Sequence, residues 1–168
     1  MKENLSLGYY EKEDVHTVIN YLRSNNKVST FGLWGRSMGA VTSILYAKET
    51  NEKGIISCIV SDSAFSSLSK LIDEFINKVI ALPQFFIDML KTQVGDIIEK
   101  KVNFRIEKIE PIEGLEKIKS IPILFCHGLD DTFINNRGQK EIVIFEGENN
   151  EKRPLQILQV ISLFFIII

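Results

Sequence analysis

The stretch that decides the fold is Phe31–Ala40, FGLWGRSMGA, in which one serine lies between two glycines at the end of an apolar run. Its centre, Gly35-Arg36-Ser37-Met38-Gly39, fits the pattern G-x-S-x-G. The apolar residues of Val28–Trp34 predict a buried strand, and Ala40–Lys48 is rich in good helix formers. The sequence therefore predicts a sharp strand-to-helix turn that presents the hydroxyl of Ser37 above the sheet. The alternative is an ordinary serine in a glycine-rich helix start.

The rest of the chain alternates short apolar runs with helical patterns. Leu7–Ser24 has apolar residues spaced for one face of an amphipathic helix. Further buried strands are predicted at Ile55–Ser61, Ile121–Cys126 and Glu141–Phe145, and a helical tail from about Arg153. Because parallel strands need helical crossovers that cover the sheet, this alternation predicts an α/β fold of about four parallel strands with flanking helices.

A long, mostly helical stretch, Ser66–Lys119, separates the second and third predicted strands. A crossover needs far fewer residues, so we expect a lid-like helical insertion over residues 66–119. It would lie above the carboxyl ends of the strands, where open α/β sheets bind their ligands. With 168 residues and 45% hydrophobic content, the chain is expected to form a single domain over residues 1–168.

Composition excludes several kinds of partner. The net charge of −2, with both signs interspersed, gives no footprint for nucleic acid and no polybasic membrane patch. Cys58 and Cys126 each lie inside an apolar run without metal-ligand spacing, so we expect reduced core thiols in a cytoplasmic protein. The apolar end of the chain, Val160–Ile168, is shorter than the roughly 20 residues of a bilayer span, and we expect a core-facing last helix there.

Four segments carry a resemblance to a known family. In chain order they are SLGYYEKEDVHTVINYLR, FGLWGRSMGAVTSILYA, IVSDSAFSSLSKLI and IPILFCHGLDDTFI. Together they resemble the α/β-hydrolase superfamily, most of all its serine-aminopeptidase-like and esterase-like branch in protists and plants, over about Ser6–Pro154. The resemblance implies a partial α/β-hydrolase fold and, in an intact relative, hydrolysis of a small ester or peptide substrate without a cofactor.

The resemblance also assigns roles to residues of the site. Ser37 matches the nucleophile, and the backbone N–H of Met38 would face the oxyanion. Asp131, the second acid of HGLDD, matches the carboxylate that orients the base, with Asp130 as its rival. Asp62 and Ser63 match an Asp-Ser pair of the family, and either shape the rim of the substrate site or cap a turn.

A serine nucleophile needs a base, normally a histidine, and in this superfamily that histidine follows the acid along the chain. The chain has two histidines, His16 and His127, and both precede Asp131. We interpret His16 as a solvated helix residue and His127 as a turn residue, the alternative being a base that reaches across the top of the sheet. Where the resemblance places the histidine stands Asn149, whose amide cannot act as a general base.

Other parts of the family pattern are also missing. The strands that precede the helix Leu7–Ser24 in the family, one of which supplies the second oxyanion donor, have no counterpart in this sequence. The strand Val28–Trp34 would then lie at an edge of the sheet, where its unpaired backbone groups would favour aggregation. We therefore expect a partial copy or an incomplete gene model, catalytically inert or nearly so. The alternatives are a non-catalytic small-molecule-binding protein and a chain that does not fold stably; the oligomeric state is left open.

Apolar residues of the expected lid allow two interpretations. Phe85, Phe86 and Met89 would either line an acyl pocket or pack in the core. Apolar residues at helical spacing belong more often to the core, so the sequence favours the second interpretation.

Overall fold

The computed structural model describes residues 5–25, 28–50, 54–79, 84–113, 115–127, 143–146, 151–153 and 164–167. The helices are α1 (Glu11–Ser24), α2 (Met38–Glu49), α3 (Leu68–Val79) and α4 (Gln84–Val102), with the short 3-10 turns η1 (Ile106–Lys108) and η2 (Leu115–Ile118). The strands are β1 (Phe31–Arg36), β2 (Ile56–Asp62), β3 (Ile123–Cys126), β4 (Val143–Glu146), β5 (Glu151–Arg153) and β6 (Phe164–Ile167).

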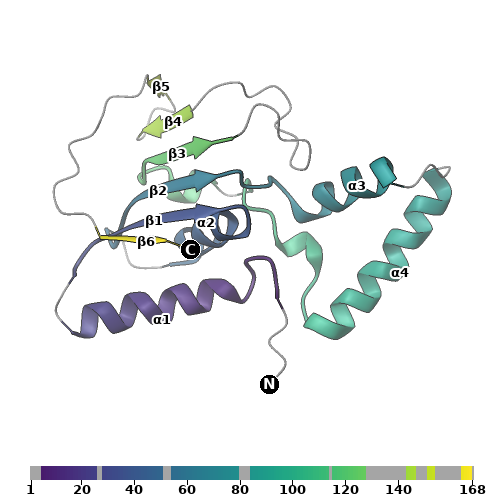
Figure 1. Cartoon of the computed structure of the whole chain (residues 1–168), viewed down its shortest axis with the longest axis horizontal. Helices are drawn as coiled ribbons and strands as arrows, with labels where there is room; N and C mark the ends of the chain where they lie inside the picture. The colour runs from purple at the N-terminus through teal and green to yellow at the C-terminus, as the bar shows by residue number, and fades with distance from the viewer. Residues whose placement is uncertain are drawn as a thin grey trace.

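Within the described residues these six strands form one sheet in the order β5-β4-β3-β2-β1-β6 (Figure 1). Strands β3, β2, β1 and β6 run parallel to one another, and β4 and β5 continue the sheet in antiparallel pairings. The predicted α/β class, with parallel strands and flanking helices, is confirmed. The arrangement is consistent with a partial α/β-hydrolase fold.

The identity of the fourth parallel strand differs from the prediction. The strand expected at residues 141–145 exists as β4, but it runs antiparallel to β3. β4 pairs with β3 through Val143–Phe145, and antiparallel neighbours do not need the helical crossover that parallel strands require. The fourth parallel strand is instead β6, which pairs with β1.

Strand β6 overturns two further expectations. The helix predicted for the end of the chain is wrong at residues 164–167, where a run of phenylalanine and isoleucine, which suit a strand, joins the sheet. The strand β1 is therefore not an edge, because β2 lies on one side of it and β6 on the other.

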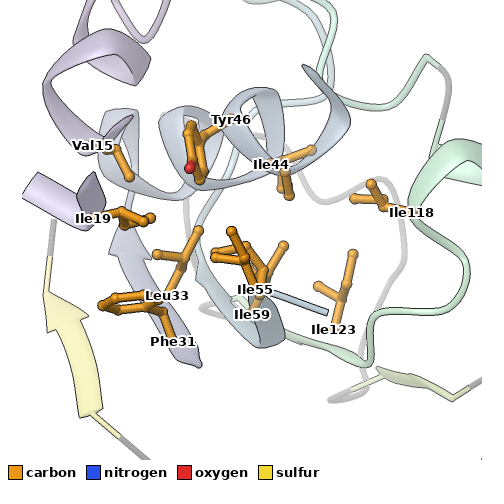
Figure 2. Close-up of a cluster of buried hydrophobic side chains, with 12 residues drawn as sticks. Val15, Ile19, Phe31, Leu33, Ile44, Tyr46, Ile55, Ile59, Ile118 and Ile123 are labelled. Carbon is orange, nitrogen blue, oxygen red and sulfur yellow. The ribbon is translucent and has the colours of Figure 1, made fainter. Parts of the chain in front are cut away.

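Helices α1 and α2 cover one face of the sheet. Side chains from both helices meet β1, β2 and β3 in a hydrophobic core, part of which is shown in Figure 2. Its buried members are Val15, Ile19, Phe31, Leu33, Ile44, Tyr46, Ala47, Ile55, Ile56, Ile59, Ile118 and Ile123. Burial of these apolar surfaces on one face fixes how the helices lie against the strands.

Helix α2 is buried on all sides along most of its length. The residues from Gly39 to Ala47 are all buried, including the polar Thr42 and Ser43. Each hydroxyl donates to the carbonyl four residues earlier, Thr42 Oγ1 to Met38 O at 2.8 Å and Ser43 Oγ to Gly39 O at 2.9 Å. These bonds satisfy the polar groups and allow the helix to lie deep in the fold.

The opposite face of the sheet is covered much less. Register places Trp34, Val60 and Leu124 side by side on that face. Trp34 is exposed and the other two are half-buried, as are Cys58 and Cys126. Both cysteines are free thiols, but they lie on this open face and are not the core thiols that the sequence predicted.

Helices α3 and α4 extend from the sheet beyond the carboxyl ends of β1, β2 and β3, and together we call them the α3–α4 arm (Figure 1). A second cluster that includes Leu68 and Phe104 ties the base of the arm to α2. Phe85, Phe86 and Met89 on α4 are exposed, so the interpretation of these residues as core is wrong. Helical spacing identified an apolar face, but none of the described core clusters contains it.

Candidate active site

The turn between β1 and α2 consists of a single residue. β1 ends at Arg36, α2 begins at Met38, and Ser37 between them has φ 51° and ψ −112°. A positive φ is strained for a residue with a Cβ, at a cost of about 1–3 kcal/mol. We call residues 35–39 the serine turn. The side chain of Ser37 is exposed at the carboxyl end of the strand.

Close packing explains the first glycine of the serine turn. A Cβ on Gly35 would lie 2.2 Å from the carbonyl carbon and oxygen of Gly39, and 2.4 Å from the backbone nitrogen of Ala40. These are backbone atoms of the first turn of α2, so they cannot move aside as a flexible side chain would. The strand and the helix touch at Gly35, as the G-x-S-x-G pattern predicts.

Among the described residues, both main-chain polar groups of Ser37 are hydrogen-bonded, whereas its hydroxyl is not. The Ser37 N–H donates to Asp62 O at 2.8 Å, and Ser37 O accepts from Val41 N at 3.2 Å. Although Ser37 is the N-cap of α2, its side chain makes no capping hydrogen bond. In an ordinary helix start, a serine at the N-cap commonly uses its hydroxyl for that bond.

The backbone N–H of Met38 is the donor that the turn offers next to Ser37. It is the first N–H of α2, and such groups have no acceptor four residues earlier in a helix. The helix N-terminus also carries partial positive charge. The Ser37 N–H is already bonded to Asp62 O, so of these two adjacent N–H groups the Met38 N–H is the one at the start of the helix without that bond.

The ladder of backbone hydrogen bonds continues across the strand ends. The Ser63 N–H donates to Cys126 O at 2.8 Å, as the Ser37 N–H does to Asp62 O. Ser37, Ser63 and His127 therefore follow the carboxyl ends of three neighbouring strands, β1, β2 and β3. His127 is half-buried, and two strand spacings of about 4.8 Å separate β1 from β3.

The side chain of Asp62 contacts both of its neighbours at these strand ends. Its Oδ1 accepts from Ser63 Oγ at 3.0 Å, and its Oδ2 lies 3.8 Å from Nε of Arg36. The Asp62 carboxylate is 35% exposed and the Arg36 side chain 82% exposed, so solvent screens this ion pair strongly. The structure thus brings Ser37, Met38, Asp62 and Ser63 together.

The two thiols on the open face of the sheet are weakly acidic. Burial raises the pKa of both Cys58 and Cys126, and the negative charge of Asp62 adds to the rise in pKa at Cys126. Both side chains therefore remain thiols at neutral pH, which makes them poor nucleophiles. The register between β2 and β3 pairs Asp62 with Cys126, so the carboxylate and the thiol lie on the same face of the sheet.

Two of the predicted site residues, Asp131 and Asn149, lie outside the described residues, as does Asp130. His16 is exposed on α1, where its Nε2 lies 2.9 Å from Nδ2 of Asn20, in agreement with a solvated helix residue. Within the described ranges, neither histidine is hydrogen-bonded to Ser37. In the same part of the chain no group of three or more His, Cys, Asp or Glu side chains has the geometry of a metal site.

Arg36 is the neighbour that sequence reasoning missed. Its contact with Asp62 follows from the parallel register of β1 and β2, which pairs these two residues. Arg36 and Asp62 both lie at the ends of strands that the sequence predicts to be neighbours, and this was the signal that the sequence offered.

Among the described residues, no helix is long and apolar enough to cross a bilayer.

Comparison with known proteins gives two likenesses. No protein-family model matches the chain. The chain is 28% identical over 153 residues to the uncharacterized protein YqkD of Bacillus subtilis, a match that covers 84% of this chain and 48% of that protein. The chain thus spans about half the length of this relative. Among solved structures it is similar to the Pyrococcus furiosus esterase Pf2001, with 26% sequence identity, a TM-score of 0.40, and coverage of 54% of this chain and 35% of the esterase.

Proposed function

We propose that the chain is a serine-hydrolase-type protein in which the serine turn is a nucleophile elbow, and that turnover by this chain is absent or very slow. The observation that carries the proposal is the exposed Ser37, held at φ 51° with a hydroxyl that takes no part in capping α2. Strain of this kind in a non-glycine residue is typical of functional sites.

In the proposed reaction, Ser37 Oγ attacks the carbonyl carbon of an ester or amide while a base takes the hydroxyl proton. The carbonyl oxygen becomes an oxyanion and accepts from the Met38 N–H. Collapse of the intermediate breaks the bond to the leaving group, which receives the proton, and water then hydrolyses the acyl-serine. Asp131 is proposed to orient the base, and Asp62 and Ser63 to form the rim of the substrate site.

The weak step in this scheme is removal of the serine proton. The base position of the resembled family holds Asn149, and an amide does not titrate near neutral pH. Without an imidazole the hydroxyl remains a poor nucleophile, which is why we expect little or no turnover. The free thiols Cys58 and Cys126 support the further proposal of a cytoplasmic location.

A fluorophosphonate probe tests this proposal, because it reacts covalently with activated serine hydroxyls. We expect slow labelling of the chain that is abolished in Ser37→Ala and accelerated in Asn149→His. Rapid labelling at Ser37 in the unmodified chain would show that a working base exists. Labelling that is equally slow in Asn149→His would remove that position as the missing base.

A non-catalytic binding protein is the second candidate function. Phe75, Phe85, Phe86 and Met89 are exposed on the α3–α4 arm, beyond the strand ends where ligands bind in open α/β sheets. Such a protein would bind an apolar small molecule and show no Ser37-dependent labelling in any variant. Displacement of a fluorescent fatty-acid analogue from the full chain, together with the labelling assay, separates the two functions.

A further inference from the structure

Two neighbouring strand ends share the same uncommon backbone conformation. Ser37 after β1 has φ 51°, and Ser63 after β2 has φ 54°. Within the described residues only two other non-glycine residues, Leu7 and Asn103, have a positive φ. Strained residues persist only where surrounding contacts hold them in place. Both serines are hydrogen-bonded to the same residue, Asp62.

The peptide group that joins Asp62 to Ser63 bridges three strands. Its carbonyl oxygen accepts the Ser37 N–H at 2.8 Å, and its N–H donates to Cys126 O at 2.8 Å. The orientation of this peptide group depends directly on φ of Ser63. Relaxation of Ser63 toward negative φ requires rotation about its N–Cα bond, which either turns this peptide plane, and its carbonyl, away from Ser37 or redirects the chain after Ser63.

The side chain of Asp62 opposes that rotation. Its Oδ1 accepts from Ser63 Oγ at 3.0 Å, which ties the strained residue back to the end of β2. The contact between Arg36 and Oδ2 of Asp62 is exposed and longer, so we expect it to contribute little to holding Ser63 in its strained conformation. The bond to Ser63 is thus the side-chain contact that supports the orientation of the peptide group, in addition to the two backbone hydrogen bonds that the group makes itself.

We propose that Asp62 is a positioning residue for Ser37: its carboxylate holds Ser63 in the strained conformation, and the peptide group between them holds the Ser37 amide. The inference rests on the proposed function, because it concerns the residue proposed as nucleophile. Asp62 acts through the backbone of the turn and takes no part in proton transfer.

Hydrogen exchange of individual amides, measured by NMR on the full chain, tests the proposal without requiring any reaction at Ser37. In Asp62→Ala we expect the Ser37 amide to exchange about tenfold faster, which corresponds to loss of roughly one hydrogen bond. The Leu33 amide in the middle of β1 should keep its rate. Asp62→Asn should restore most of the protection, since its side-chain oxygen can still accept from Ser63 Oγ.

Asp96→Ala, which removes an exposed carboxylate on α4, is the matched control and should leave both amides unchanged. An unchanged Ser37 amide in Asp62→Ala would overturn the proposal. So would equal acceleration at Leu33 and Ser37, because Asp62 would then support the sheet as a whole, and so would failure of Asp62→Asn to restore protection. If neither the unmodified chain nor Asn149→His reacts with fluorophosphonate, the proposed function fails, but amide exchange still decides the role of Asp62.

Discussion

The two faces of the sheet differ sharply in burial, as adjacent residues of the same strand show. On β1, Leu33 is fully buried against α1 and α2, whereas Trp34 points to the other face and is 45% exposed. Their neighbours on β2 follow the same division, with Ile59 buried and Val60 only half-buried. Parallel strands are ordinarily covered on both faces. In the described part of this chain, one face provides the core, and the serine turn is built on that face, since Gly35 touches α2.

The comparison teaches that the backbone of the serine turn depends first on the packing of Gly35 against α2, to which the polar contacts of Asp62 are added. The turn is fixed where β1 meets the first residues of α2, a helix buried along most of its length. Changes on the covered face should therefore disturb both stability and the serine turn. Changes of exposed apolar residues on the open face, such as Trp34, should be tolerated.

The largest expected effect is that of Gly35→Ala, because the new Cβ would overlap backbone atoms of α2 at 2.2 Å. We expect a loss of more than about 4 kcal/mol in the free energy of unfolding, measured by urea denaturation, or no folded protein at all. Gly95→Ala on α4 is the control, because a Cβ there meets nothing within 4 Å and alanine favours a helix by about 1 kcal/mol. A Gly35→Ala chain as stable as the unmodified chain would contradict the close contact between β1 and α2.

The next effect compares the two faces directly. Leu33→Ala should lower the free energy of unfolding by about 2–5 kcal/mol, since it leaves a cavity in the core. Trp34→Thr should lower it by less than about 1 kcal/mol, because the indole is half exposed and threonine suits a strand. Both are measured by denaturant unfolding under the same conditions. Equal losses in the two variants would mean that the second face is covered as well as the first.

The smallest effect concerns the thiols of the open face. The negative charge of Asp62 contributes to the raised pKa of Cys126, so Asp62→Asn should lower that pKa and increase the thiolate fraction at pH 8. Alkylation of Cys126 by iodoacetamide, followed by mass spectrometry, should become faster. Cys58, whose raised pKa comes from burial, should react at its original rate and serves as the internal control. Equal acceleration at both cysteines would point to loosening of the sheet.

The sequence was informative where structure follows from local pattern. β1, β2 and β3 lie where continuous apolar runs predicted them, because buried parallel strands leave little room for polar residues. The direction of β4 was not predictable in the same way, since it depends on the connection and not on the strand itself. For β6 a short apolar run is ambiguous between helix and strand, and pairing with β1 decided the outcome.

In the candidate site, too, local features could be predicted from the sequence and contacts between separate elements could not. The strained Ser37 was predictable from two glycines in the sequence, because so close a turn leaves no room for larger residues. The contact of Asp62 with Arg36 was harder to predict, because it depends on the register between β1 and β2, whereas the contact with Ser63 joins adjacent residues. The exposure of Phe85 on the α3–α4 arm was also not predictable, since helical spacing does not tell what an apolar face meets.

The hydroxyl of Ser37, which makes no hydrogen bond to the described residues, bears on which substitutions can accumulate at position 37 during evolution. Within the described residues the fold makes no use of that oxygen, so a lineage released from selection for catalysis would retain Gly35 and lose the serine. Glycine adopts positive φ without strain and would be the favoured replacement at position 37. Serine at this position among close descendants would then be a record of retained chemistry, whereas the glycine before it would record only the ancestry of the fold.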